Sequence, residues 1–168
     1  MNRDKAIIAE LAERVPELSE ECQTMITPWI EVCQRGSKEP FLPADIEYWR
    51  ALQANNPEQC KDEIDAPLAC IVFESSLFPL LIELLNDYER HARLKEIMDW
   101  LEELQGDDDF DVRNLVGISI CEQLLGNHPE YLPKLLPFMG EDLRESCREC
   151  FSSLRVSDEN KRLLNQSD

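Results

Sequence analysis

The chain has 168 residues, 43% of them hydrophobic, which is enough for one domain that buries a core without the help of a metal or a disulfide. It carries 35 acidic and 17 basic residues, and this net charge of −18 repels nucleic acid and anionic lipid alike. We therefore expect no direct contact with DNA, RNA or a membrane, and we predict a single helical domain over residues 1–168.

Residues 1–57 are predicted to form N-terminal helices. Apolar residues recur three and four apart from Ile7 to Val15, which predicts a first helix ending near Pro16. Ser19 can cap a second helix that ends at Gly36, and a third begins near residue 43. The first ten residues lack the apolar stretch of a signal peptide, so we predict a cytoplasmic protein.

The most apolar part of the chain runs from Ala66 to Leu85. It contains Glu74 and Glu83, and a membrane-spanning helix would not readily tolerate two carboxylates. Proline at position 79 removes one helix hydrogen bond and clashes with the preceding turn. We therefore predict a buried helical hairpin with a break near Leu77.

Residues 65–156 as a whole are predicted to form stacked helical hairpins, followed by a polar tail at 157–168. Apolar helices repeatedly lead through a short acidic turn into another helix, most clearly at Asp108 to Arg113. This pattern resembles HEAT-like repeats, in which an Asp-rich turn and a following Val-Arg mark the second helix. The sequence thus predicts an all-α fold of about eight helices, either irregular HEAT-like stacked hairpins or a plain helical bundle.

The densest charge lies in a sixteen-residue stretch, 96–111, with eight acidic and no basic residues. Like charges three or four apart destabilise a helix by about 0.2–0.5 kcal/mol per pair, a cost that a basic partner would offset. The alternative is a solvated face that only aids solubility. The candidate partner-binding residues, called the acidic ridge below, are Glu96, Asp99, Glu102, Glu103, Asp107, Asp108, Asp109 and Asp111.

Part of this stretch has the spacing of a calcium-binding loop. Asp107, Asp109 and Asp111 occupy its first, third and fifth positions. However, Val112 stands where the loop requires glycine, and Ile118 stands where it requires glutamate. We therefore predict no metal site here.

Residues typical of catalytic sites occur without their motifs. Cys147 and Cys150 form the only C-x-x-C pair and are predicted to be core-facing thiols, and neither His91 nor His128 lies in a motif for nucleophilic catalysis. We predict no catalytic residue, no cofactor and no enzymatic activity.

A separate pair, Ser119 and Glu122, lies three residues apart in a predicted core helix. Residues at this spacing share one face of an α-helix. Either both side chains face outward, or they form a buried polar contact that holds adjacent helices in register.

The stretch from Asp108 to Leu125, DDFDVRNLVGISICEQLL, together with the helix at 94–104, resembles small helical bacterial proteins of polymorphic toxin systems of the contact-dependent inhibition type. The resemblance covers residues 68–154 and carries over no catalytic residue. It implies an immunity protein, which binds and neutralises a toxin domain.

Charge and resemblance together favour an inhibitor that covers the basic cleft of a nuclease-like toxin with its acidic ridge. One alternative is a HEAT-like adaptor that joins two proteins without inhibiting either. A helical hydrolase is the second alternative, and it would need a convergent polar pocket around Glu122, His91 or His128.

Overall fold

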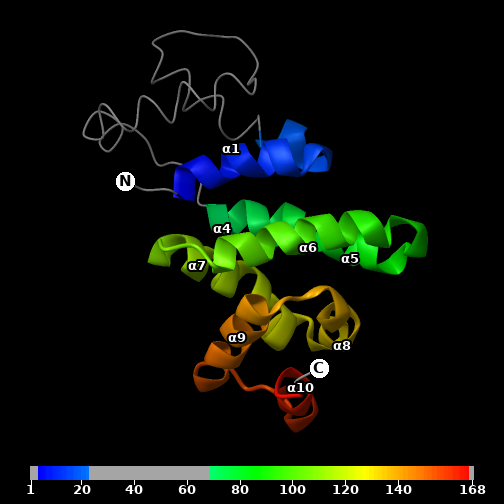
Figure 1. Ribbon diagram of the computed structural model, residues 1–168, viewed down its shortest axis with the longest axis vertical. Helices are drawn as coiled ribbons and strands as arrows, with labels where there is room; N and C mark the ends of the chain where they lie inside the picture. The colour runs from blue at the N-terminus through cyan, green and yellow to red at the C-terminus, as the bar shows by residue number, and fades with distance from the viewer. Residues whose placement is uncertain (1–3, 23–68, 167–168) are drawn as a thin grey trace, which may run out of the picture. The chain divides into compact units, whose positions relative to one another are not determined.

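A computed structural model of the chain describes residues 4–22 and 69–166 (Figure 1). Over these ranges it contains eight α-helices, joined by 3-10 and π-helical segments, and no strand. The all-α prediction is therefore confirmed. The predicted helices between residues 23 and 57, and the loop from Gly36 to Pro43, lie outside the described residues.

The chain divides into two compact units, Met1–Val72 and Phe73–Asp168. In the first unit, α1 (Asp4–Arg14) buries the predicted apolar stripe, including Ile7 and Leu11. It ends just before the 3-10 turn η1 (Pro16–Leu18), where proline occupies a first-turn position that needs no N–H donor. Within the same unit α1 contacts α4 (Ala69–Val72).

The predicted hairpin in the apolar segment is wrong. From α4 the chain continues through a π-helical turn, η2 (Phe73–Leu77), into α5 (Phe78–Asn86) without a non-helical residue. Pro79 lies in the first turn of α5. A π turn contains one more residue than an α turn, and this gives the carbonyl groups before the proline room to avoid its ring.

The resulting helix, Ala69–Asn86, is the one helix among the described residues that is long and apolar enough to cross a membrane. Half of it is buried inside the protein. The core helix of a globular protein has the same length and composition, so these properties do not distinguish the two. The absence of membrane contact stays a prediction.

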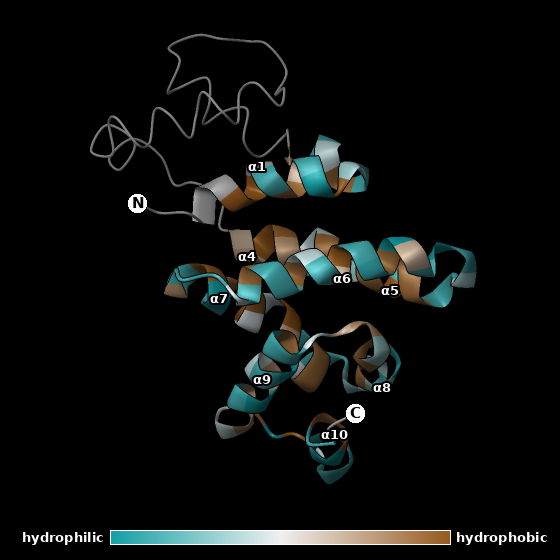
Figure 2. Cartoon of the chain, viewed as in Figure 1, coloured by the Kyte–Doolittle hydropathy of each residue, from teal (hydrophilic) through white to brown (hydrophobic). Residues whose placement is uncertain are grey.

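The second unit is built around α6 (His91–Gln105), which contacts α5, α7 and α9. One face of α6 is buried, and in Figure 2 the face turned to the viewer is mainly hydrophilic. Trp100 packs on Phe73, with 6.0 Å between the ring centroids. The other elements are η3 (Tyr88–Arg90), α7 (Phe110–Val116), η4 (Gly117–Cys121), η5 (Gln123–Asn127), η6 (Pro129–Tyr131), α8 (Leu132–Leu135), η7 (Leu136–Phe138), α9 (Glu141–Glu149) and η8 (Cys150–Ser152).

The predicted polar tail contains a last helix, α10 (Asp158–Leu164). The Ser157 hydroxyl accepts a hydrogen bond from the backbone N–H of Asn160 at 3.2 Å and caps the helix start. α10 contacts α8 and α9 and buries Leu164. The segment from Ser157 therefore adds to the core of the second unit.

The start of α9 is capped by a side chain from another helix. Its N-cap residue, Gly140, has no side chain to offer, and the carboxylate of Glu102 on α6 takes that role. One oxygen accepts from the N–H of Asp142 at 2.7 Å and the other from the N–H of Leu143 at 3.0 Å. A negative charge is favourable at a helix N-terminus, so this cap fixes α9 against α6.

Gly140 is glycine because the carboxylate needs its space. A Cβ atom at residue 140 would lie 2.3 Å from Cδ of Glu102, well inside van der Waals contact. Any side chain there would displace the carboxylate from the helix end. The cap therefore depends on both residues together.

We expect Glu102→Ala to lower the free energy of unfolding by about 1–2 kcal/mol, because two N–H groups lose a charged acceptor. Urea denaturation would measure the change. Glu89→Ala, at an exposed position away from this junction, is the control and should cost less than about 0.5 kcal/mol.

Gly140→Ala should also destabilise the protein by displacing the Glu102 carboxylate from the start of α9. The losses in unfolding free energy from the two substitutions should therefore not be additive. We expect the double variant Glu102→Ala/Gly140→Ala to be clearly more stable than the sum of the single losses implies. Strict additivity in the same denaturation assay would show that the cap does not couple these residues.

Candidate partner-binding surface

The α6 part of the acidic ridge is largely exposed. Glu96, Asp99 and Glu103 all lie on the outer surface of the helix. Glu96 accepts a hydrogen bond from Arg93 at 2.9 Å, and Asp99 forms an ion pair with Lys95. Both cations lie just before the sixteen-residue stretch. Their positive charges partly offset the predicted repulsion among its carboxylates.

The turn after α6 uses its aspartates differently. The carboxylate of Asp107 accepts from the N–H of Asp109 at 2.9 Å, and that of Asp109 accepts from the N–H of Asp111 at 3.0 Å. Asp109 is the N-cap of α7. This alternation of aspartates, which has the spacing of a calcium loop, is thus a pair of side-chain turns that start a helix.

The ridge therefore separates into two groups. Glu102, Asp107 and Asp109 are half-buried, and each directs its carboxylate to backbone N–H groups. The remaining five members are exposed, and these are Glu96, Asp99, Glu103, Asp108 and Asp111. Any partner of the ridge would meet mainly this exposed group.

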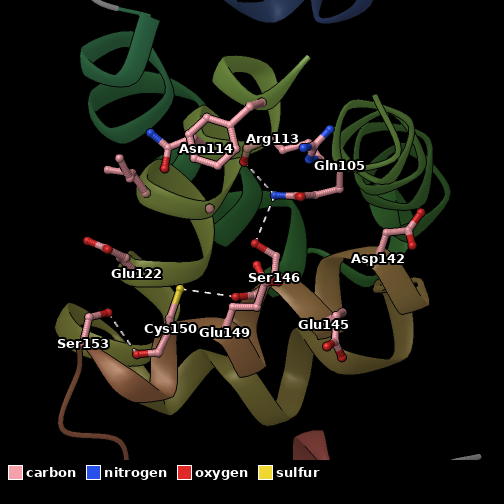
Figure 3. Close-up of a pocket in the computed structure, with 13 residues that line it drawn as sticks. Gln105, Arg113, Asn114, Glu122, Asp142, Glu145, Ser146, Glu149, Cys150 and Ser153 are labelled. Atoms are coloured by element: carbon pink, nitrogen blue, oxygen red, sulfur yellow. Dashed lines mark hydrogen bonds between the residues drawn. The ribbon is translucent and has the colours of Figure 1, made fainter. Parts of the chain in front are cut away.

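Beside the turn lies a cavity of about 460 Å³, called the groove below, that the sequence analysis did not predict (Figure 3). The C-terminal end of α6, the helical run from α7 into η4, and α9 supply most of its lining. Gln105, a buried residue of α6, joins these three elements. Its Nε2 donates to the carbonyl of Arg113 at 2.9 Å and to Oγ of Ser146 at 3.1 Å.

Two large apolar side chains are exposed on the lining of the groove. Phe110 is 67% exposed and Ile118 is 38% exposed. Between them in sequence, Gly117 allows η4 to approach α9 closely, since a Cβ at that position would lie 3.2 Å from Oγ of Ser146. The groove thus has a close approach of two small residues, Gly117 and Ser146, beside the exposed side chains of Phe110 and Ile118.

Acidic side chains dominate the charge of the groove. Among the described residues, four acids line it, against one cation, Arg113; the acids are Glu122, Asp142, Glu145 and Glu149. The guanidinium of Arg113 donates to the carbonyl of Asp107 and lies 5.9 Å from the centre of the Phe110 ring. Glu145 pairs with Arg148 at 2.6 Å. Even with these contacts, the lining keeps an excess of carboxylates.

Glu122 reaches the groove on the same face of the helical run as Ile118, four residues before it. It lies between two π-helical turns, η4 and η5. Ser119 is fully buried, whereas Glu122 is half-buried and faces the groove (Figure 3). Neither predicted arrangement of this pair is observed, because a π turn changes the spacing that puts residues three apart on one face.

The two histidines lie away from the groove. His91 Nε2 is 3.0 Å from the carbonyl of Leu85, and the ring of His128 stacks on that of Phe78 with 5.4 Å between centroids. Neither histidine lines the groove together with Glu122. The polar pocket that a hydrolase would need therefore contains carboxylates but no histidine.

The C-x-x-C thiols are not activated. Cys147 is buried, and the pKa of its thiol is raised. The larger cause is its hydrogen bond with Cys121, and the second is its burial. Cys150 lines the groove, and burial raises the pKa of its thiol to about 12. Thiols with raised pKa values are poor nucleophiles and poor metal ligands at neutral pH. Within the described residues no group of three or more His, Cys, Asp or Glu side chains is placed to hold a metal ion.

We expect alkylation of Cys150 by iodoacetamide to be slow at neutral pH and to rise about tenfold per pH unit from about pH 7 to pH 10, because the thiolate fraction rises at that rate below a raised pKa. Peptide mapping by mass spectrometry would measure the rate. A short unstructured peptide with one internal cysteine in the same solution, whose rate levels off above about pH 9, is the control. A similar levelling at Cys150 would contradict the raised pKa.

Comparison with known proteins gives one result. The model of the family described as "Domain of unknown function (DUF7674)" matches residues 8–153, which is most of the chain and includes the ridge and all the lining residues of the groove. No curated protein and no solved structure matches the chain.

Proposed function

Since the chain belongs to this family, whose description names no activity, we propose a function from its own surface: an immunity-type inhibitor that binds and neutralises a toxin domain. The toxin proposed is a basic, nuclease-like domain whose active-site cleft the acidic surface covers. A cytoplasmic location, a bacterial origin and an irregular HEAT-like stacking of helices belong to the same proposal. The observation that carries it is the set of five exposed ridge carboxylates beside an acidic groove.

Charge supports this function through complementarity. A nuclease cleft is basic because it must hold phosphates, and a protein with a net charge of −18 competes for the same cleft. Exposed carboxylates also steer the encounter and speed association. An acidic ridge on a helix is a rigid surface for such a contact, because its backbone is already fixed.

The chemistry of the groove supports binding over catalysis. Its lining holds no histidine, and burial raises the pKa of its one thiol to about 12, so the lining lacks the thiolate–histidine pair of cysteine-dependent catalysis. Carboxylates surrounding exposed apolar groups are suited to contact a basic protein surface.

The direct test is neutralisation of a neighbouring gene product. The protein encoded immediately upstream would be expressed with and without this chain in the same cells. We expect growth arrest without the chain, growth with it, and a stable complex on co-purification. If the upstream protein is harmless, or stays toxic when the chain is present, the inhibitor proposal is wrong.

We expect Asp108→Lys/Asp111→Lys to slow association with that partner by about tenfold and to weaken its salt dependence. Both residues are exposed, whereas Asp107 and Asp109 are left unchanged because their carboxylates shape the turn. Surface plasmon resonance at low and high salt would measure both effects.

Its matched control is Glu89→Lys/Glu130→Lys, which changes the net charge equally at exposed positions outside the ridge and the groove. Association of the control should stay within about twofold of the wild type. Equal slowing by the two variants would mean that net charge alone, and not the ridge, governs binding.

A further inference from the structure

We propose that the groove between α6, α7 with η4, and α9 is a socket for one lysine or arginine side chain of a partner protein, flanked in the partner by an apolar residue. This inference rests on the proposed function, because it takes the partner to be a basic protein. Beyond that function, it specifies where one side chain of the partner binds and which atoms of this chain contact it.

The groove has an amide acceptor on its lining. Gln105 uses its Nε2 for both of the hydrogen bonds that the amide nitrogen can donate. Its Oε1 lies on the lining of the groove and is reached by solvent. A donor that enters the groove can therefore replace water at Oε1.

The surrounding charges specify that the donor is a cation. Glu122 and Glu149 line the groove, and neither carboxylate makes a hydrogen bond or ion pair within the described parts of the chain. Asp142 adds a third carboxylate. Lysine and arginine side chains carry only donors and a positive charge, which matches a lining of acceptors.

The apolar wall specifies a side chain on a protein and not a free ion. Phe110 and Ile118 are two of the four large hydrophobic side chains that are exposed among the described residues. They lie on the lining of the same groove, where the methylene groups of a lysine or arginine and a neighbouring apolar residue would cover them. A metal or an inorganic cation would leave both uncovered.

The backbone also shapes the groove in an unusual way. Ile118 lies within one π turn, and Glu122 lies between that turn and the next. π turns are rare and occur often at functional sites. Ile118 and Glu122 are four residues apart and share one face of the helical run, which puts an apolar and an acidic side chain on the same cavity.

A second copy of this chain is a poor occupant. Two molecules that each carry a charge of −18 repel one another, so a basic partner is favoured over self-association. This alternative is still an outcome of the test below.

Short peptides serve as the probe. An acetylated, amidated Leu-Lys-Leu peptide would be titrated into the full-length, ¹⁵N-labelled protein and followed by NMR. We expect saturable shifts at Gly117, Ile118 and the side-chain amide of Gln105. Replacing lysine by norleucine, or both leucines by serine, should each weaken binding by about fivefold or more. Equal binding of all three peptides, or shifts centred elsewhere, would overturn the proposal.

Variants of the protein then test whether the peptide binds in the groove or is attracted by the net negative charge alone. Glu122→Gln/Glu149→Gln should weaken binding of the lysine peptide by about tenfold, and Ile118→Ser should weaken it without any change in charge. Glu89→Gln/Glu130→Gln, with the same change in net charge elsewhere, should stay within about twofold. Equal weakening by both charge variants would show non-specific attraction and would overturn the socket. Loss of a dimer in the Ile118→Ser variant, seen by sedimentation, would assign the groove to a second copy instead.

The two proposals can fail separately. If the groove variants neutralise the upstream toxin as well as the wild type does, the groove is not a partner socket and the inhibitor proposal survives. If the lysine peptide binds the groove as described but the upstream protein is not neutralised, the socket survives and the inhibitor proposal fails.

Discussion

Glu102 and Gln105, one turn apart on α6, both reach across to α9, and the second unit depends on this junction. The carboxylate of Glu102 holds the first N–H groups of α9, and the amide of Gln105 holds the Ser146 hydroxyl and the backbone of α7. Polar contacts of this kind are directional, so they set the position of α9 more tightly than apolar packing alone. The groove exists because these three elements are held at a fixed separation.

The acidic ridge contains two kinds of carboxylate, those that hold the backbone and those that are exposed. Three members of the acidic ridge hold backbone N–H groups, and five remain exposed. The structural carboxylates keep their charge but already accept from backbone donors, so fewer of their lone pairs are open to the donors of a partner. Repulsion among the exposed group is reduced by Arg93 and Lys95. The carboxylates that can contact a partner directly are thus mainly the five exposed members of the ridge.

The groove draws much of its chemistry from one face of the helical run that contains α7 and η4. A regular helix through residues 110–127 would carry Ser119 and Glu122 on one face. With two π turns, Ser119 is buried in the core and Glu122 lines the groove with Ile118. Gly117 leaves room for α9 to approach. A cavity lined by acids, an amide acceptor and exposed apolar groups is the result, and it has the character of a recognition site.

The sequence by itself determined the all-α class, the first helix up to Pro16, the helix at 94–104 and the acidic turn that leads into α7, because helical spacing and capping residues act over a few neighbouring positions. It also located the acidic ridge, since charge density is a property of the sequence. Only the tertiary structure decided that Glu102 caps a helix 40 residues away in the chain, that the helix through Pro79 is continuous, and that Glu122 faces a groove. Those outcomes depend on long-range contacts and on π turns, and no local pattern of residue types encodes either.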